Sequence, residues 1–197
     1  MAKRYIWLSV MALLPLALAL GCGEMGKVDQ GRVIDYDQDK GIVTLIQDKK
    51  AEAGSPDYNT LPPHAYTIPA DPNEMGPEPK AGKRMKLDVE KKEIVLFDAA
   101  NQNFKAVKFD LVDKKQGVAK NDPLVEGKKF PVIDIERKTI SIYSGRQKLL
   151  VVFSVPDEYM SLPPDTWEAG DEVRIYYKEP GKALRLMNIS KTDIFKK

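Results

Sequence analysis

Apolar and polar residues alternate in short runs along most of the chain, and a charged or turn-forming cluster separates each pair of runs. The clearest case is residues 132–143 (VIDIERKTISIY), where the cluster ERK divides two alternating runs. Alternation with a period of two places successive side chains on opposite faces of a β-strand, whereas a helix requires a period of about 3.6. The pattern therefore predicts half-buried antiparallel β-hairpins and an all-β fold.

The same pattern recurs, which indicates internal duplication. Residues 87–97 (LDVEKKEIVLF) align with residues 133–143 without a gap. Residues 33–46 (VIDYDQDKGIVTLI) align as a third copy when their turn is taken to be two residues longer. Each of the two later copies leads into a further alternating segment, at 105–112 and at 149–155. We therefore expect hairpins to be the unit of construction, with a third strand added to two of them.

Two Leu-Pro-Pro segments indicate a larger repeat. Residues 58–63 read YNTLPP and residues 159–164 read YMSLPP, and each is followed by an aromatic residue, Tyr66 or Trp167. Each segment then leads to a glycine that opens another strand pair. The order hairpin, Leu-Pro-Pro, hairpin thus occurs twice, which predicts two related small antiparallel β modules.

The composition suggests where these modules divide. We expect the first module at residues 31–113, a polar linker at 114–127 and the second module at 128–197. Residues 53–83 hold half of the 14 prolines, which remove ladder donors and predict a long irregular loop. A loop of this length is usually functional or disordered, and its apolar residues favour an ordered loop lying across a sheet.

A fourth hairpin, residues 170–190 (GDEVRIYYKEPGKALRLMNIS), ends the second module. It resembles the closing strands of small bacterial barrels of the OB or SH3 type, which implies a small-barrel or sandwich-like module. Its aromatic and basic residues include Arg174 and Tyr176, and on an OB module such a face can stack bases. An ordinary polar sheet face is the simpler interpretation.

The first residues have the order of a secretory signal. Two basic residues precede an apolar run at 6–20, and the run ends in ALGC at Cys22, the only cysteine. The run is too short and ends too abruptly for a stable membrane span. We expect a signal peptide at residues 1–21 and a tether at residues 22–30. An ordinary secretory cleavage near Gly21 and an uncleaved anchor are the alternatives.

The small residue before Cys22 resembles a bacterial lipobox, in which the signal peptidase cuts before the cysteine and the thiol is joined to diacylglycerol. The resemblance implies acyl chains such as palmitate on Cys22, and several chains hold a protein on a bilayer far better than one. Gly23, where inner-membrane lipoproteins carry Asp, implies the periplasmic face of the outer membrane. The rest of the chain resembles an uncharacterised family of bacterial lipoproteins from anaerobes, which implies no activity.

The charge balance gives no indication of a nucleic-acid partner. The chain has 31 Lys and Arg against 29 Asp and Glu, and Lys3 and Arg4 leave with the signal peptide. The mature chain is then neutral, with both signs spread evenly, so it lacks the basic footprint of a nucleic-acid-binding protein. With its one thiol acylated, the chain is not expected to form a disulfide within itself.

Aromatic, histidine and methionine residues of the proline-rich loop and the second Leu-Pro-Pro segment form the candidate ligand site. They are Tyr58, His64, Tyr66, Met75, Tyr159 and Trp167. Hydrophobic corners that close one end of a barrel are the alternative, and we favour it. His64 is the only histidine and has no acid or nucleophile near it in sequence, which argues against catalysis. His64 and Met75 together suggest a soft metal such as copper.

The first turn suggests a weaker alternative, a calcium loop formed by Asp35, Asp37 and Asp39, whose carboxylates recur two residues apart. A helix-loop-helix calcium loop would have its glycine one place before Gly41 and a bidentate Glu where this chain has Ile46. The acids are more simply explained as solvent-facing residues of the hairpin, so we expect no metal and no cofactor.

Motifs of redox, nucleotide-binding and serine-nucleophile enzymes do not occur in the sequence. We therefore expect a non-enzymatic envelope lipoprotein, anchored in the lipid bilayer through Cys22, that binds or scaffolds an envelope protein partner. A small-ligand or metal carrier that uses the proline-rich loop is one alternative. An envelope hydrolase that acts through a pair of acids is another, because acidic residues are plentiful.

Overall fold

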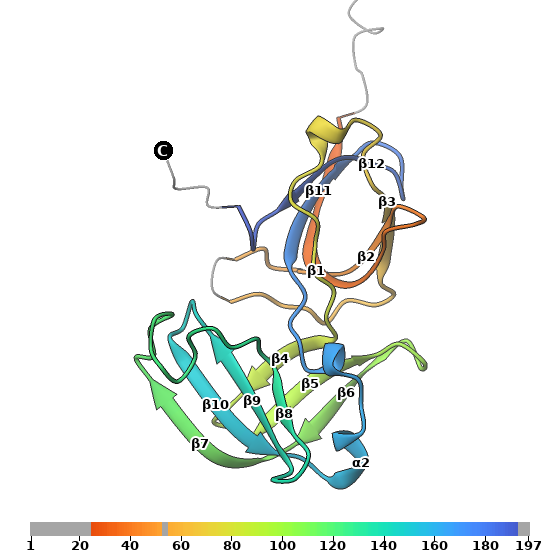
Figure 1. The fold of residues 1–197 in the computed structure, drawn as a ribbon. Coiled ribbons are helices and arrows are strands. Elements are labelled where there is room, and N and C mark those ends of the chain that lie inside the picture. Colours follow the sequence, from red (N-terminus) through yellow and green to blue (C-terminus); the bar gives the residue numbers. More distant parts are fainter. Residues whose placement is uncertain (1–24, 53–54, 193–197) are drawn as a thin grey trace, which may run out of the picture.

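The computed structural model describes residues 25–52 and 55–192, and it is nearly all β (Figure 1). The strands are β1 (Lys27–Asp37), β2 (Ile42–Gln47), β3 (His64–Thr67), β4 (Arg84–Asp88), β5 (Glu93–Asp98), β6 (Asn103–Lys108), β7 (Asp110–Gln116), β8 (Val132–Asp134), β9 (Thr139–Ser144), β10 (Leu149–Ser154), β11 (Glu172–Tyr177) and β12 (Ala183–Asn188). The short helices are η1 (Pro72–Glu74), α2 (Asp157–Met160) and η2 (Pro164–Thr166). No helix in the described ranges is long and apolar enough to cross a membrane. The all-β prediction is confirmed.

The strands form three antiparallel sheets in two bodies. The upper body in Figure 1 is a curled five-stranded sheet with the order β12-β11-β1-β2-β3. Its two ends approach each other at an isolated bridge between Thr67 and Lys182, without closing into a barrel. In the lower body, a four-stranded sheet (β7-β10-β9-β8) faces a three-stranded sheet (β4-β5-β6).

All four predicted hairpins are present, but their pairing divides the chain differently from the predicted modules. The last hairpin joins the first, because β11 pairs with β1 from Lys27 to Arg32. The predicted modules at 31–113 and 128–197 are therefore wrong, since the first and last hairpins make one body together with β3, and strands β4 to β10 make the other. Alternation specifies each hairpin locally but does not say which hairpins pair with each other.

Two predicted connecting segments also belong to sheets. Strand β1 begins at Lys27, within the tether expected at residues 22–30. Strand β7 reaches Gln116, inside the linker expected at 114–127, and it pairs with β10. The strand expected at residues 105–112 is in fact β6 and β7, which follow each other and belong to opposite sheets of the lower body.

The turns of the three related hairpins are equal in length, which corrects the predicted alignment. Asp37, Asp88 and Asp134 each end a strand and accept a hydrogen bond from the backbone N–H three residues later. The residue after each donor has positive φ, and these residues are Gly41, Lys92 and Lys138. The two extra residues of the first copy lie in β1, which has a β-bulge between Val33 and Asp35.

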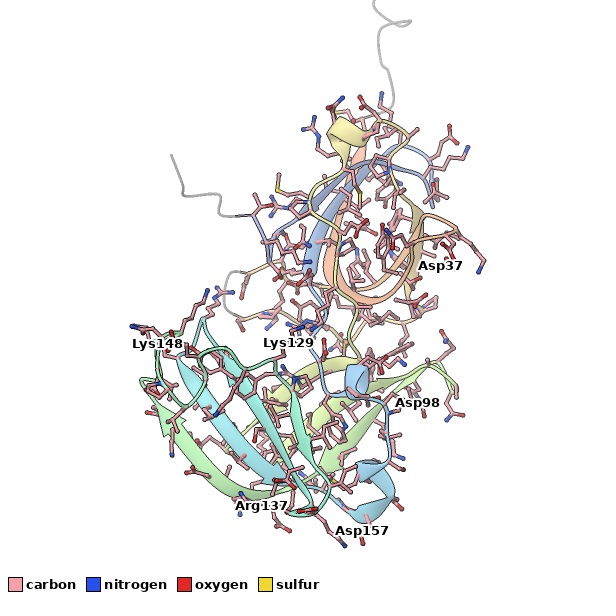
Figure 2. The ribbon with its side chains drawn as sticks, viewed as in Figure 1. Asp37, Asp98, Lys129, Arg137, Lys148 and Asp157 are labelled. Atoms are coloured by element: carbon pink, nitrogen blue, oxygen red, sulfur yellow. The ribbon has the colours of Figure 1, made fainter. Side chains whose placement is uncertain are left out.

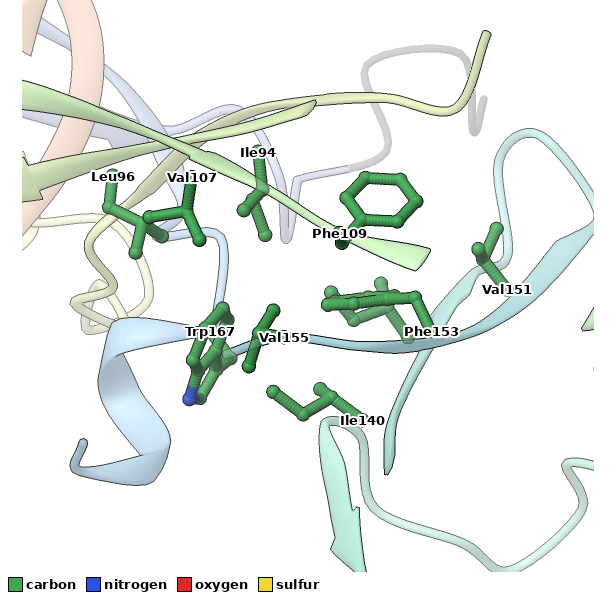
Figure 3. Packing of buried hydrophobic residues seen from close by; sticks show 10 residues of the cluster. Ile94, Leu96, Val107, Phe109, Ile140, Val151, Phe153, Val155 and Trp167 are labelled. Carbon is green, nitrogen blue, oxygen red and sulfur yellow. The ribbon is translucent and has the colours of Figure 1, made fainter. Parts of the chain in front are cut away.

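The two sheets of the lower body enclose the largest hydrophobic core (Figure 3). Equivalent strands of the two later copies contribute Ile94 and Leu96 from one sheet and Ile140 and Ile142 from the other. The ring of Phe153 packs on Phe109, with centroids 4.7 Å apart, and on Trp167, at 6.3 Å. The duplicated meanders, β4-β5-β6 and β8-β9-β10, therefore pack their apolar faces against each other.

Two backbone segments connect the bodies side by side. Residues 80–84 and 165–171 are joined by hydrogen bonds from Arg84 N to Glu168 O (2.9 Å) and from Asp171 N to Lys80 O (2.8 Å). Gly82 and Gly170 lie where these segments touch each other and Val33 of β1. At the junction, the backbones of residues 80–84, residues 165–171 and β1 therefore lie very close to one another.

Candidate functional site

The structure does not gather the predicted ligand residues into one site. His64 and Tyr66 lie on β3 in the curled sheet, and Met75 packs against the core of that sheet beside β12. Tyr159 lies in α2 at the surface of the lower body, whereas Trp167 is fully buried in its core. The residues form separate clusters, and each has to be considered by itself.

The His64 cluster is organised by Asp29, a buried acid of β1. Oδ2 of Asp29 lies 2.8 Å from His64 Nδ1 and also accepts a hydrogen bond from the Tyr66 hydroxyl. Oδ1 accepts from Gln47 Nε2 at 3.1 Å and from the Tyr177 hydroxyl at 3.4 Å. His64 has no acid near it in sequence, but β1 brings Asp29 to it from 35 residues away.

The chemistry of this cluster fits a structural role. Burial and the hydrogen bond to Asp29 raise the pKa of Tyr66, so its hydroxyl keeps its proton and donates. The His64 side chain is 37% exposed, and no hydroxyl or thiol of the described residues hydrogen-bonds to its ring. An acid that orients an imidazole could position a general base, but a nucleophile is missing from the described surroundings. The Asp29 carboxylate links β1 to side chains of β2, β3 and β11 by hydrogen bonds.

A pocket of about 500 Å³ lies in the lower body, beside the second Leu-Pro-Pro segment. Its apolar lining comes from the end of β5, the following turn and the Leu-Pro-Pro segment: Leu96, Phe97, Ala99, Ala100, Leu162 and Pro163. Tyr159 forms one wall, and the ammonium group of Lys105 on β6 lies 4.7 Å from the centre of its ring. This geometry suits an apolar group, with polar contacts at the rim.

The charged residues of this pocket are nearly balanced. Lys83 forms an ion pair with Asp165 at 3.0 Å, and Asp98 accepts hydrogen bonds from the turn that follows it. Lys105 and Glu158 complete the rim without ion pairs between described residues. The sequence pointed to Tyr159 through the YMSLPP motif, but it gave no sign of Lys83 or Lys105, which reach the pocket from other strands.

The two Leu-Pro-Pro segments have different structural surroundings. Tyr58 of the first segment is buried, and the guanidinium of Arg32 lies 4.2 Å from the centre of its ring. Burial raises the pKa of Tyr58 to about 12, so the ring remains neutral beneath the cation. In the first segment Tyr58 is buried, but Leu61 and Pro62 are exposed and the curled sheet does not close into a barrel, so the segment does not seal a barrel end. The second segment lines a pocket. They do not form a joint ligand platform.

In the turn of the first hairpin, Asp37 forms its hydrogen bonds with Lys40 of the same turn. Asp37 accepts from the backbone N–H of Lys40 and pairs with the Lys40 ammonium at 2.6 Å, which lowers the pKa of Asp37. Figure 2 shows Asp37 at the tip of its hairpin, on the outside of the molecule. Across residues 25–52 and 55–192, no three His, Cys, Asp or Glu side chains are grouped as metal ligands. Asp35, Asp37 and Asp39 therefore do not make the suggested calcium loop.

Cys22, the predicted site of lipidation, lies outside the described residues. No curated protein and no solved structure matches the chain. Residues 24–197 match the family described as "Domain of unknown function (DUF4881)". Because this match covers most of the sequence, the chain belongs to that family.

Proposed function

We propose that this chain is a non-enzymatic lipoprotein of the cell envelope that binds a partner protein in the pocket beside Tyr159. The observation that carries the proposal is the pocket itself, which is open to solvent and offers apolar surface from Leu162 and Pro163. Its volume of about 500 Å³ falls in the range of ligand pockets. The occupant we infer is a surface segment of the partner that inserts one apolar or aromatic side chain.

The surroundings of the pocket support this choice. Tyr159 presents an aromatic ring and a hydroxyl, a combination that is common at protein interfaces. The balanced rim charges favour an uncharged side chain in the pocket over a free ion. An anchor at Cys22 would hold this pocket close to the membrane, where envelope proteins are at high local concentration.

The partner prediction can be tested by cross-linking in cells. A photoreactive phenylalanine analogue at position 162 is expected to give one discrete cross-linked product, because Leu162 lines the pocket. The matched control is position 61, the corresponding leucine of the first segment, which is exposed but lies away from the pocket. Identical products from both positions, or none from position 162, would contradict the proposed binding site.

The lipid anchor gives a second expected result. In cells fed labelled palmitate, the wild-type chain is expected to carry the label and to fractionate with the outer membrane, because the thiol of Cys22 is the acceptor. Cys22→Ser should abolish the label, and globomycin should cause the unprocessed precursor to accumulate. Label retained by Cys22→Ser would show that acylation occurs elsewhere or not by this route.

A further inference from the structure

A second, smaller pocket lies at the junction of the two bodies, on the other side of the segment 165–169. It encloses about 180 Å³ between the start of β4, the end of β9 and the residues after η2. Its walls are largely aromatic and its polar groups are largely cationic. The residues that matter for the argument are Lys80, Arg84, Phe130, Tyr143, Trp167 and Glu168.

Arg84 supplies an incompletely paired cation to this pocket. Its Nε donates to the carbonyl oxygen of Trp167 at 2.9 Å, and it forms no ion pair within the described part of the chain. Burial, with the nearby Arg32, lowers the pKa of Arg84 to about 10, so the group is still cationic at neutral pH. Arg84 is partly buried, and Glu168 lies near enough to oppose this shift by raising the pKa, but the Glu168 carboxylate forms its ion pair with Lys80.

The remaining charges leave a net excess of one positive charge. Lys80 forms an ion pair with Glu168, so these two side chains balance each other. Arg84 is then the unbalanced charge among the groups that line the pocket. The complementary ligand is a monoanion.

Trp167 also lines the pocket. The residue is fully buried, and its Nε1–H has no hydrogen-bond acceptor among the described residues. Figure 3 shows the indole nitrogen at the end of the ring that lies away from Leu96 and Val107 of the facing sheet. Because this nitrogen has almost no accessible surface, Trp167 contributes an aromatic wall and a fluorescent reporter to the pocket, and not a hydrogen-bond donor for the ligand.

Two more aromatic residues line the pocket. The ring centroids of Phe130 and Tyr143 lie 5.7 Å apart, and the Tyr143 hydroxyl donates to Val118 O at 3.0 Å. The pocket therefore offers aromatic side chains beside the guanidinium of Arg84 and the ion pair of Lys80 with Glu168. A phosphate or sulfate would leave these aromatic side chains without a partner.

We propose that this pocket binds a small organic monocarboxylate with an aromatic body, its carboxylate held by Arg84 and its ring lying among the aromatic residues that line the pocket. A guanidinium matches a carboxylate in shape and can form two parallel hydrogen bonds with it. The limited volume restricts the body to about a single ring. The site is separate from the pocket beside Tyr159, so it holds whether or not a partner protein binds there.

Fluorescence of Trp167 provides a direct test, with benzoate as the probe. The chain has two tryptophans, so Trp7→Phe in the full chain leaves Trp167 as the only one. Benzoate is expected to change its emission saturably, with half-saturation at about 1 mM or below, an affinity that the charge-assisted contact and the burial of the ring provide together. Benzamide, the neutral analogue, should bind at least about tenfold more weakly. Inorganic phosphate should not compete.

Three results would overturn the proposal. Equal binding of benzoate and benzamide would mean that no carboxylate is recognised, and competition by phosphate at similar concentrations would mean a general anion site. A lack of any saturable response would mean that the pocket does not bind this class.

Variants then locate the binding. Arg84→Met should weaken benzoate binding at least about tenfold, since the charged contact is lost. Arg174→Met is the matched control, because that arginine is exposed, hydrogen-bonds to Gln30 and does not line the pocket, so the variant should bind as the parent does. Should Arg84→Met fail to fold by circular dichroism, Ala169→Met keeps Arg84 and fills the pocket, and it should also lose binding. Parent-like binding by the folded pocket variants would contradict the assignment.

Discussion

Replacing Gly170 with alanine is expected to destabilise the protein by about 3 kcal/mol or more, because no space exists for a Cβ atom at the junction. A methyl group there would overlap the carbonyl oxygen of Val33 and come within 3.0 Å of the backbone nitrogen of Gly82. All three groups are backbone, so no side chain can rotate to relieve the overlap. For a chain of this size, the loss corresponds to a fall in melting temperature of about 6–12 °C.

The melting temperature by calorimetry measures this effect, and Gly145→Ala is the matched control. The nearest atom to a Cβ on Gly145 is Cε of Lys120 at 3.1 Å, the end of a flexible side chain that can move away. Gly82→Ala should resemble Gly170→Ala, since its Cβ would lie 2.6 Å from the nitrogen of Gly170. Equal melting temperatures for Gly170→Ala and Gly145→Ala would show that the connecting segments are not packed as described.

The close approach at Gly170 is accompanied by hydrogen bonds from both connecting segments to β1. Val33 lies in the middle of β1, and its N–H donates to Asp171 O at 2.9 Å while its carbonyl accepts from Gly82 N at 3.1 Å. The bulge that follows Val33 turns the strand at the place where both connections pass. The glycines that opened strand pairs in the sequence are thus the contact points between the two bodies.

Local features of the fold could be predicted from the sequence because they depend on neighbouring residues. Alternation identified all four hairpins, and the ungapped match of 87–97 with 133–143 identified the two meanders that share a core. The pairing of β11 with β1 could not be predicted, because both strands alternate correctly and either could have paired with another edge. The turn of the first copy was misaligned because a bulge adds residues without changing the pattern.

The candidate sites could likewise be predicted only where they depend on residues that are neighbours in the sequence. Tyr159 could be selected because a repeated motif contains it, but Lys105 and Lys83 reach its pocket from distant strands. Trp167 followed the same motif, and its fully buried side chain shows that an aromatic residue beside a motif can be part of the core. Arg84 was not selected, because one arginine among 31 basic residues has no distinguishing pattern. Only the fold separates a partly buried arginine without an ion pair from an arginine exposed to solvent.

Asp29 is the clearest case of a residue that only the fold reveals. It lies in the segment taken as a tether, where the polar residues Lys27, Asp29 and Gln30 obscure the alternation of a strand. In the structure it is buried at 5% exposure and joins β1 to side chains from β2, β3 and β11. Asp29 accounts for the position of His64 in the fold, and the hydrogen bonds from neighbouring strands account for the burial of Asp29.

Asp29→Ala is therefore expected to destabilise the protein by about 3–5 kcal/mol, the range found when one member of a buried charged network is removed. The change leaves the hydroxyls of Tyr66 and Tyr177 without their acceptor inside the apolar core of the curled sheet. Asp29→Asn keeps the shape and one acceptor oxygen, so its loss should be smaller, about 1–3 kcal/mol. Urea unfolding followed by circular dichroism measures both losses.

Asp39→Ala is the control for these variants, because Asp39 is exposed in the turn of the same hairpin and its removal should leave the unfolding midpoint unchanged. The order of the three variants distinguishes two explanations of the cluster. A carboxylate that holds four strands predicts that Asp29→Ala is the least stable and that Asp29→Asn lies between it and the parent. An Asp29→Ala protein as stable as Asp39→Ala would mean that the strands are held by their ladders and apolar packing alone. His64 and its acid would then need a role other than stability.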